Sequence, residues 1–196
     1  MYEEKKFNLP ELKGLSAKQI EAHLGLYAGY VKHTNLIMEQ IRELKESDME
    51  NKAYIMAELR RRLGFEFNGM RMHEYYFTQF EGGAVPLAEN SPLMALAKNR
   101  YGENGIEGHV KEVAGTRGIG WVVVYYDPES KSVHTAFVED HQIGQLGGLP
   151  VLLAVDLWEH AFMVDYLPSQ KKDYVEAFFE NLNWSVVEKR LEEATR

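Results

Sequence analysis

Residues 149–160, LPVLLAVDLWEH, decide the fold and point to a site, because an apolar run ends there at a carboxylate. Leu149 to Val155 is the longest apolar run in the chain and predicts a buried strand. Asp156 follows at once, and His160 lies four residues later. A buried strand-end carboxylate is costly unless it is paired or coordinated, and carboxylate with imidazole suits iron, manganese or zinc. The alternative, an N-capping aspartate beside an unrelated histidine, stays open on this pentapeptide alone.

The first 80 residues are predicted to be mostly a helical hairpin. Ser16 and Gln19 match a capping box, in which the Ser16 side chain accepts from the Gln19 N–H and the Gln19 side chain reaches back. Apolar residues then keep a helical spacing to about Lys45. A second helical stretch is expected from Ser47-Asp48 to Leu63 and, after Gly64, a further helical run from Phe67 to Phe80.

After Pro86 the sequence changes from helical to strand-like patterns and back. The expected elements are helices at 91–102 and 106–114, a strand hairpin at 121–126 and 133–138, a third strand at 149–155, and closing helices at 157–166, 172–182 and 185–194. We therefore expect an α+β protein with two domains. Residues 1–85 would form an N-terminal long helical hairpin, and residues 86–196 a C-terminal lobe with a three-stranded antiparallel sheet surrounded by helices.

Composition excludes several classes of function. The formal net charge of −8 argues against nucleic acid or an anionic membrane as a partner, because phosphate groups require a basic face. The absence of cysteine excludes disulfides, a thiol nucleophile and cysteine-ligated metal sites. No apolar run reaches the ~18 residues of a membrane helix, and the polar N-terminal MYEEKKFNLPELKG has no secretory-signal pattern. We expect a cytoplasmic protein whose metal chemistry uses histidine and carboxylate.

Two of the seven histidines lie in the predicted hairpin at positions that favour a shared site. His23 and Tyr30 are seven residues apart, close to two helical turns, so their side chains should point the same way. His73 lies on an aromatic helical face, where a histidine is more often part of the core than a ligand. Two helices that each present one inward histidine would supply two ligands to a site completed by the C-terminal lobe.

The residues resemble the iron/manganese superoxide dismutases over essentially the whole chain. DLWEHAFMVDY at 156–166 is similar to that family's D-x-W-E-H-A-Y-Y motif, which carries the last two metal ligands. GIGW at 118–121 resembles the family's GSGW, and Asn183-Trp184 resembles its C-terminal NW. FEFNGMRMHEYYF at 65–77 aligns without a gap with the helix that bears the second ligand.

The resemblance implies an oxidoreductase that disproportionates superoxide with one iron or manganese ion per chain, with iron favoured. Its implied metal ligands are His23, His73, Asp156 and His160. Tyr30 matches the tyrosine near the substrate funnel, and Trp121 and Trp158 match its aromatic walls. Glu159 matches the glutamate that reaches the other subunit's ligand histidine, so a homodimer is expected, with a tetramer left open.

The resemblance also implies a role for His141. Family members supply a hydrogen-bond donor to the solvent at the metal, either from the helix of the second ligand or from the loop before the third strand. The helix position falls on Gly69, which has no side chain to serve, and the loop position falls on His141. His141 is therefore expected in the site, the alternative being a loop histidine in solvent.

The chain departs from the family pattern near the substrate gateway. His23 and Tyr30 are seven residues apart where the family has eight, the family's KHH is Leu26-Tyr27-Ala28 here, and the second tyrosine of HAYY is Met163. Phe77 replaces a family tryptophan. These changes motivate an alternative function, a non-catalytic or differently catalytic metal-binding protein of the same fold. A zinc hydrolase is a further alternative, but no H-E-x-x-H motif is present. A locally positive funnel, with Lys32 or Arg71 nearby, would have to offset the acidic net charge.

Overall fold

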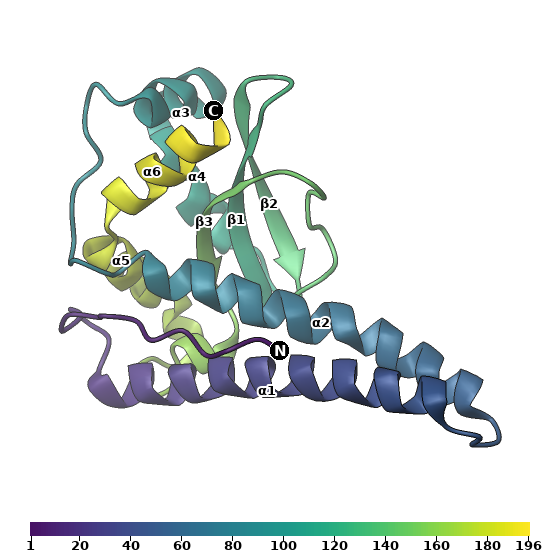
Figure 1. The fold of residues 1–196 in the computed structure, drawn as a ribbon. Helices are drawn as coiled ribbons and strands as arrows, with labels where there is room; N and C mark the ends of the chain where they lie inside the picture. The colour runs from purple at the N-terminus through teal and green to yellow at the C-terminus, as the bar shows by residue number, and fades with distance from the viewer.

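The computed structural model describes residues 1–196 and shows a helical hairpin packed beneath a small sheet that helices cover (Figure 1). The elements are α1 (Ala17–Glu46), α2 (Lys52–Thr78), α3 (Pro92–Tyr101), η1 (Gly102–Asn104), α4 (Gly105–Ala114), β1 (Gly120–Asp127), β2 (Ser132–Glu139), β3 (Val151–Asp156), η2 (Glu159–Ala161), η3 (Pro168–Gln170), α5 (Lys171–Asn181) and α6 (Trp184–Ala194). The expected α+β class, with a helical hairpin followed by a three-stranded antiparallel sheet and helices, is confirmed. No helix is long and apolar enough to cross a membrane.

The hairpin is formed by α1 and α2, which lie side by side along much of their length (Figure 1). The Ser16 side chain caps α1 by accepting from the Gln19 N–H at 3.1 Å, as the capping box predicts. The predicted interruption at Gly64 is wrong, because α2 runs unbroken through it. The helix begins at Lys52, with Asn51 as its N-cap residue, rather than at Ser47-Asp48. A single glycine costs a helix only about 1 kcal/mol relative to alanine, which packing against α1 offsets.

The sheet has the strand order β2-β1-β3, and both pairs are antiparallel. The central strand β1 is buried along nearly its whole length, which explains its run of β-branched and aromatic residues. In this register Trp121 lies opposite Asp156 on one side and Val138 on the other. A Cβ at Gly120 would lie 2.0 Å from the Val138 carbonyl oxygen, so the second glycine of the GIGW motif is required by this close approach.

The helix predicted at 157–166 is wrong. The chain forms only the short 3-10 helix η2 and a series of turns between Asp156 and Tyr166. The Asp156 carboxylate accepts from the Trp158 N–H at 2.9 Å, and this local bond turns the chain away from regular helix as it leaves β3. The other closing helices, α5 and α6, lie within one residue of their predicted positions.

The two parts of the chain share a core. One continuous cluster of buried apolar side chains joins the hairpin, the sheet and the covering helices. Arg190 on α6 further connects them by donating to the carbonyl oxygens of Leu152 on β3 and Tyr75 on α2, at 2.8 and 3.0 Å. The predicted division at residues 85 and 86 falls in the connection between α2 and α3 and stays a prediction.

Candidate metal centre

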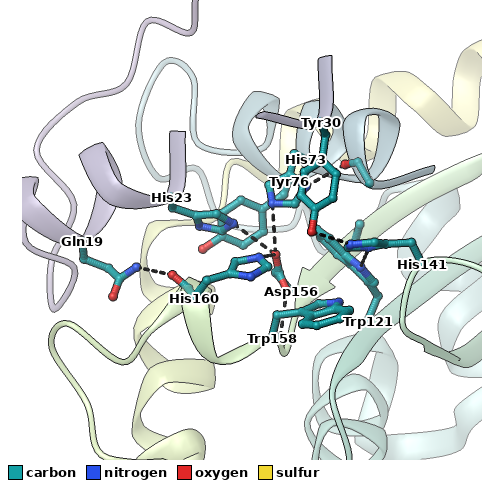
Figure 2. A network of polar contacts seen from close by, with 12 residues as sticks. Gln19, His23, Tyr30, His73, Tyr76, Trp121, His141, Asp156, Trp158 and His160 are labelled. Carbon is teal, nitrogen blue, oxygen red and sulfur yellow. Dashed lines mark hydrogen bonds and ion pairs between the residues drawn. The ribbon is translucent and has the colours of Figure 1, made fainter. Parts of the chain in front are cut away.

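Four predicted ligand residues from distant parts of the sequence meet between the hairpin and the sheet (Figure 2). His23 comes from α1, His73 from α2, Asp156 from the end of β3 and His160 from η2. One ligand atom from each lies within 4.8 Å of all the others. His23, His73 and Asp156 are fully buried, and the His160 side chain is 16% exposed. The four side chains are therefore largely shielded from solvent, and only that of His160 is partly exposed.

All three imidazoles direct Nε2 at one carboxylate oxygen. Asp156 Oδ2 lies 3.1 Å from His23 Nε2, 3.2 Å from His160 Nε2 and 3.7 Å from His73 Nε2. Burial by itself would raise the pKa of Asp156, but the neighbouring His160 and His23 outweigh it and hold that pKa below its usual range. The carboxylate is therefore ionised, as a metal ligand must be.

The proton of His73 lies in the position that suits a metal ligand. Burial lowers the pKa of His23 and of His73, so both rings are neutral. His73 Nδ1 lies 2.6 Å from the Gly69 carbonyl oxygen, which can only accept, so Nδ1 holds the proton and Nε2 presents a lone pair. That buried Nε2 has no hydrogen-bond partner. Three imidazole nitrogens and one carboxylate fit an iron or manganese ion, which would satisfy this orphaned atom.

Gln19 was identified in the sequence only as part of a capping box, and its side chain has a different role. It donates to the His160 carbonyl oxygen at 2.7 Å and accepts from the Val164 N–H at 2.9 Å instead of reaching back to the helix start. It thereby ties the turn that carries His160 to α1. The available signal was its position four residues before His23, which places both on one helical face.

Tyr30, His141 and Trp121 form a hydrogen-bonded chain beside the four ligands (Figure 2). The Trp121 indole N–H, which can only donate, lies 2.9 Å from His141 Nδ1. Burial lowers the pKa of His141 to about 4, so the ring is neutral and its single proton lies on Nε2. Nε2 therefore donates to Tyr30 Oη at 2.8 Å, which leaves the Tyr30 hydroxyl proton free. His141 is fully buried, so the alternative of a loop histidine in solvent is wrong.

Gly69 makes room for this chain. A Cβ at Gly69 would lie 2.6 Å from Cδ1 of Tyr30, so any side chain there would displace the tyrosine ring. The Tyr30 ring packs 5.0 Å from the His73 ring between centroids. Gly69 therefore leaves the space that Tyr30 occupies, and His141 on the loop holds Tyr30 there by a hydrogen bond.

Trp158 and Glu159, the remaining predicted site residues, differ in their surroundings. The Trp158 ring stacks at 5.0 Å on His141 and at 5.7 Å on His160, and its indole N–H donates to the Asp140 carbonyl oxygen at 3.2 Å. Glu159 is exposed and forms no ion pair within the chain. Sequence reasoning missed Phe65, whose ring lies 4.6 Å from that of His141.

The fold and the site define a class of protein, a mononuclear metal protein with three histidines and one aspartate between a helical hairpin and an antiparallel sheet. A family model for the C-terminal domain of iron/manganese superoxide dismutases matches residues 92–190. An iron superoxide dismutase of Sulfolobus acidocaldarius is 31% identical, over 91% of this chain and 86% of that protein. An iron superoxide dismutase of Aquifex aeolicus is 32% identical, over 94% of this chain and 88% of that protein. A superoxide dismutase of Aeropyrum pernix, named for manganese or iron, is 29% identical over 84% and 77%.

The chain belongs to the iron/manganese superoxide dismutase family. It is accordingly an oxidoreductase that disproportionates superoxide with one iron or manganese ion. The resemblance that the sequence motifs indicate is confirmed.

Proposed function

We propose that His23, His73, Asp156 and His160 hold one iron or manganese ion and that superoxide is disproportionated there. The observation that carries this assignment is the convergence of four ligand atoms within 4.8 Å in a chain of this family. When bound, the ion supplies a redox couple that takes an electron from one superoxide and returns it to another. In the balanced reaction, two superoxide ions and two protons give one dioxygen and one hydrogen peroxide.

The chain's own task beyond holding the ion is to present a proton. Trp121 keeps His141 in the tautomer that donates to Tyr30, so the Tyr30 O–H is directed away from His141. Burial, with a smaller contribution from Asp156, raises the pKa of Tyr30, so the hydroxyl keeps its proton. We assign Tyr30 Oη as the group that offers a hydrogen bond to the anion, and His141 as the residue that orients it.

Trp158 is assigned as an aromatic wall of the site, because its ring covers both His141 and His160. Such a wall excludes water from the ligand residues and limits the size of what reaches them.

The surface around Glu159 is proposed to form a homodimer. Glu159 is exposed, and the exposed apolar side chains of Met163, Val164 and Leu167 follow it closely. Exposed apolar residues beside a charged one are typical of an interface with an apolar centre. Sedimentation of the chain should give a dimer, and Glu159→Ala should weaken it, with Glu50→Ala on the distant hairpin turn as the control. A monomer at micromolar concentration would contradict this assignment.

The ligand assignment is tested by metal content and superoxide-consuming activity. Asp156→Ala and His160→Ala are each expected to lower metal affinity at least about tenfold and to abolish activity. His109→Ala, which removes a histidine stacked on Tyr101 away from the site, should retain both. A protein fully loaded with iron or manganese but inactive would contradict the catalytic assignment and favour a non-catalytic metal-binding relative.

The cytoplasmic location predicted from the sequence is retained as a proposal.

A further inference from the structure

The partly exposed side of the site is where an anion has to approach. Three of the four ligand residues are fully buried, whereas Tyr30, Phe65 and Trp158 are each partly exposed. The centroid of the Phe65 ring lies 6.2 Å from that of the Tyr30 ring and 6.4 Å from that of the Trp158 ring. The formal charge of −8 disfavours the approach of superoxide from bulk solvent. A positive charge held on this side would attract superoxide at the place where the anion approaches the site.

Arg62 is held in place beside Phe65. Its guanidinium carbon lies 3.8 Å from the centroid of the Phe65 ring, within the range of a cation–π contact. Its Nε and Nη2 both lie 2.7 Å from Glu66 Oε1. The Arg62 side chain would otherwise be mobile, but it is restricted by two contacts with the Glu66 carboxylate and one with the Phe65 ring.

The ion pair is oriented with its positive end outward. The Arg62 side chain is 51% exposed, whereas the Glu66 side chain is 5% exposed and also faces His33 Nδ1 at 3.8 Å. The buried carboxylate therefore lies toward the helices and the guanidinium toward solvent. Because the pair is a dipole rather than a free charge, its attraction for an anion is modest and short in range.

The charge of Arg62 reaches the residues of the site. Burial, together with the neighbouring His160 and Arg62, lowers the pKa of His141 to about 4 against the opposing charge of Asp156. Around Tyr30, burial and then Asp156, Glu66 and Asp140 raise the pKa of its hydroxyl, and Arg62 opposes them. Arg62 is the one permanent cation among the charges that act most strongly on these two groups. Arg71, considered from the sequence, instead pairs with Glu74 at 2.7 Å and lies over Tyr2 and Phe67.

We propose that Arg62, held on Phe65 by Glu66, is a steering residue that draws superoxide toward the Tyr30 side of the metal site. The inference rests on superoxide as the substrate. Arg62 does not touch the ligand residues, so its effect is expected on encounter with the anion and not on the chemical step. Removing its charge should lower kcat/KM at low ionic strength and leave kcat nearly unchanged.

The test uses the metal-loaded protein and charge variants on a single helix. Arg62→Gln is compared with Arg61→Gln, which removes the same charge one residue earlier from a side chain that pairs with Glu58 at 2.7 Å. Arg62→Glu reverses the charge, and Arg62→Lys keeps it while losing the two-atom contact with Glu66. The first readout is kcat/KM for superoxide between about 10 and 200 mM salt, over which charge screening increases several-fold. The second, independent of turnover, is the dissociation constant of azide measured by absorbance.

Arg62→Gln should lower kcat/KM roughly two- to tenfold at low salt and weaken azide binding by a similar factor. The deficit should shrink toward the wild-type value at high salt, Arg62→Glu should be more severe, and Arg62→Lys should recover most of the loss. Arg61→Gln should stay within about twofold of the wild type. Equal effects of Arg61→Gln and Arg62→Gln, or a deficit that salt does not change, would overturn the proposal. An inactive wild-type protein would instead contradict the proposed function, so the two failures are distinguishable.

Discussion

At the scale of single residues, the site depends on one position that has no side chain. Gly69 carries no Cβ, and the ring of Tyr30 occupies the space that a Cβ would need. The same residue supplies the carbonyl oxygen that fixes the proton of His73 on Nδ1. One glycine thus positions both His73, a proposed metal ligand, and the tyrosine beside it.

Gly69→Ala is predicted to displace Tyr30 and break its hydrogen bond to His141. The contact of 2.6 Å that the new Cβ would make has to be relieved by movement of the ring, at a cost of about 1–3 kcal/mol in the free energy of unfolding. Activity should fall together with stability. Urea unfolding and superoxide consumption measure the two effects. Gly64→Ala on the same helix, where the space is open, should instead stabilise by about 0.5–1 kcal/mol; equal behaviour of the two variants would contradict the packing account.

His141 is predicted to make the protein less stable as the pH falls below about 6.5. The unfolded state binds a proton on this histidine near pH 6.5, but in the folded state burial lowers the pKa to about 4. Between these values stability falls by up to about 1.4 kcal/mol per pH unit. Between pH 7 and 5, metal-free wild type should therefore lose about 2 kcal/mol more than His141→Gln in urea unfolding. Identical pH dependence of the two proteins would show that His141 is not buried in its neutral form.

At the scale of elements, the positions of most helices and strands follow from local sequence patterns. The β1–β2 hairpin, α3, α4, α5 and α6 were predicted with small errors at their ends, because each has a clear periodicity or cap. The continuous α2 was not predicted, since packing along α1 outweighs the weak helix preference of Gly64. The segment after β3 was predicted as a helix at 157–166, but the hydrogen bond from the Trp158 N–H to Asp156 imposes a tight turn.

Arg190 is predicted to hold α6 against the hairpin and the sheet. Its guanidinium donates to Leu152 and Tyr75 carbonyl oxygens, and also to the Thr78 hydroxyl at 2.6 Å. Arg190→Met keeps much of the apolar stem but leaves these acceptors unpaired, so the free energy of unfolding should fall by about 2–4 kcal/mol. Lys189→Met, at the exposed neighbouring position, should change it by less than about 0.5 kcal/mol. Denaturant unfolding of both variants measures these changes. Similar losses of unfolding free energy in the two variants would contradict the role of Arg190.

At the scale of the whole molecule, the site is held together by folding and in turn supports the fold. Its four proposed ligand residues lie on α1, α2, β3 and η2, so no single element contains the site. Without a metal, the folded state keeps an ionised aspartate and three imidazoles at the junction of the hairpin and the sheet. A metal that binds only the folded arrangement therefore stabilises the entire chain.

Loading with iron or manganese is predicted to raise Tm by on the order of 10 °C relative to the metal-free protein. The increase arises because metal binding is lost on unfolding, and calorimetry of the two forms measures it. Asp156→Ala should lose most of this increase, since it removes the carboxylate on which all three histidines converge. An equal Tm with and without metal would contradict a site assembled only in the folded protein.

The sequence by itself determined the class of fold, the family and the nine candidate site residues, because strand and helix patterns and the D-x-W-E-H motif are local properties of the chain. It also identified Gly69 and His141 as the alternative positions for one hydrogen-bond donor. Only the tertiary structure decided that Gln19 braces the His160 turn, that Trp121 sets the tautomer of His141, and that Arg62 packs on Phe65. These contacts join residues on different elements, and their existence depends on packing distances and burial that no local pattern encodes.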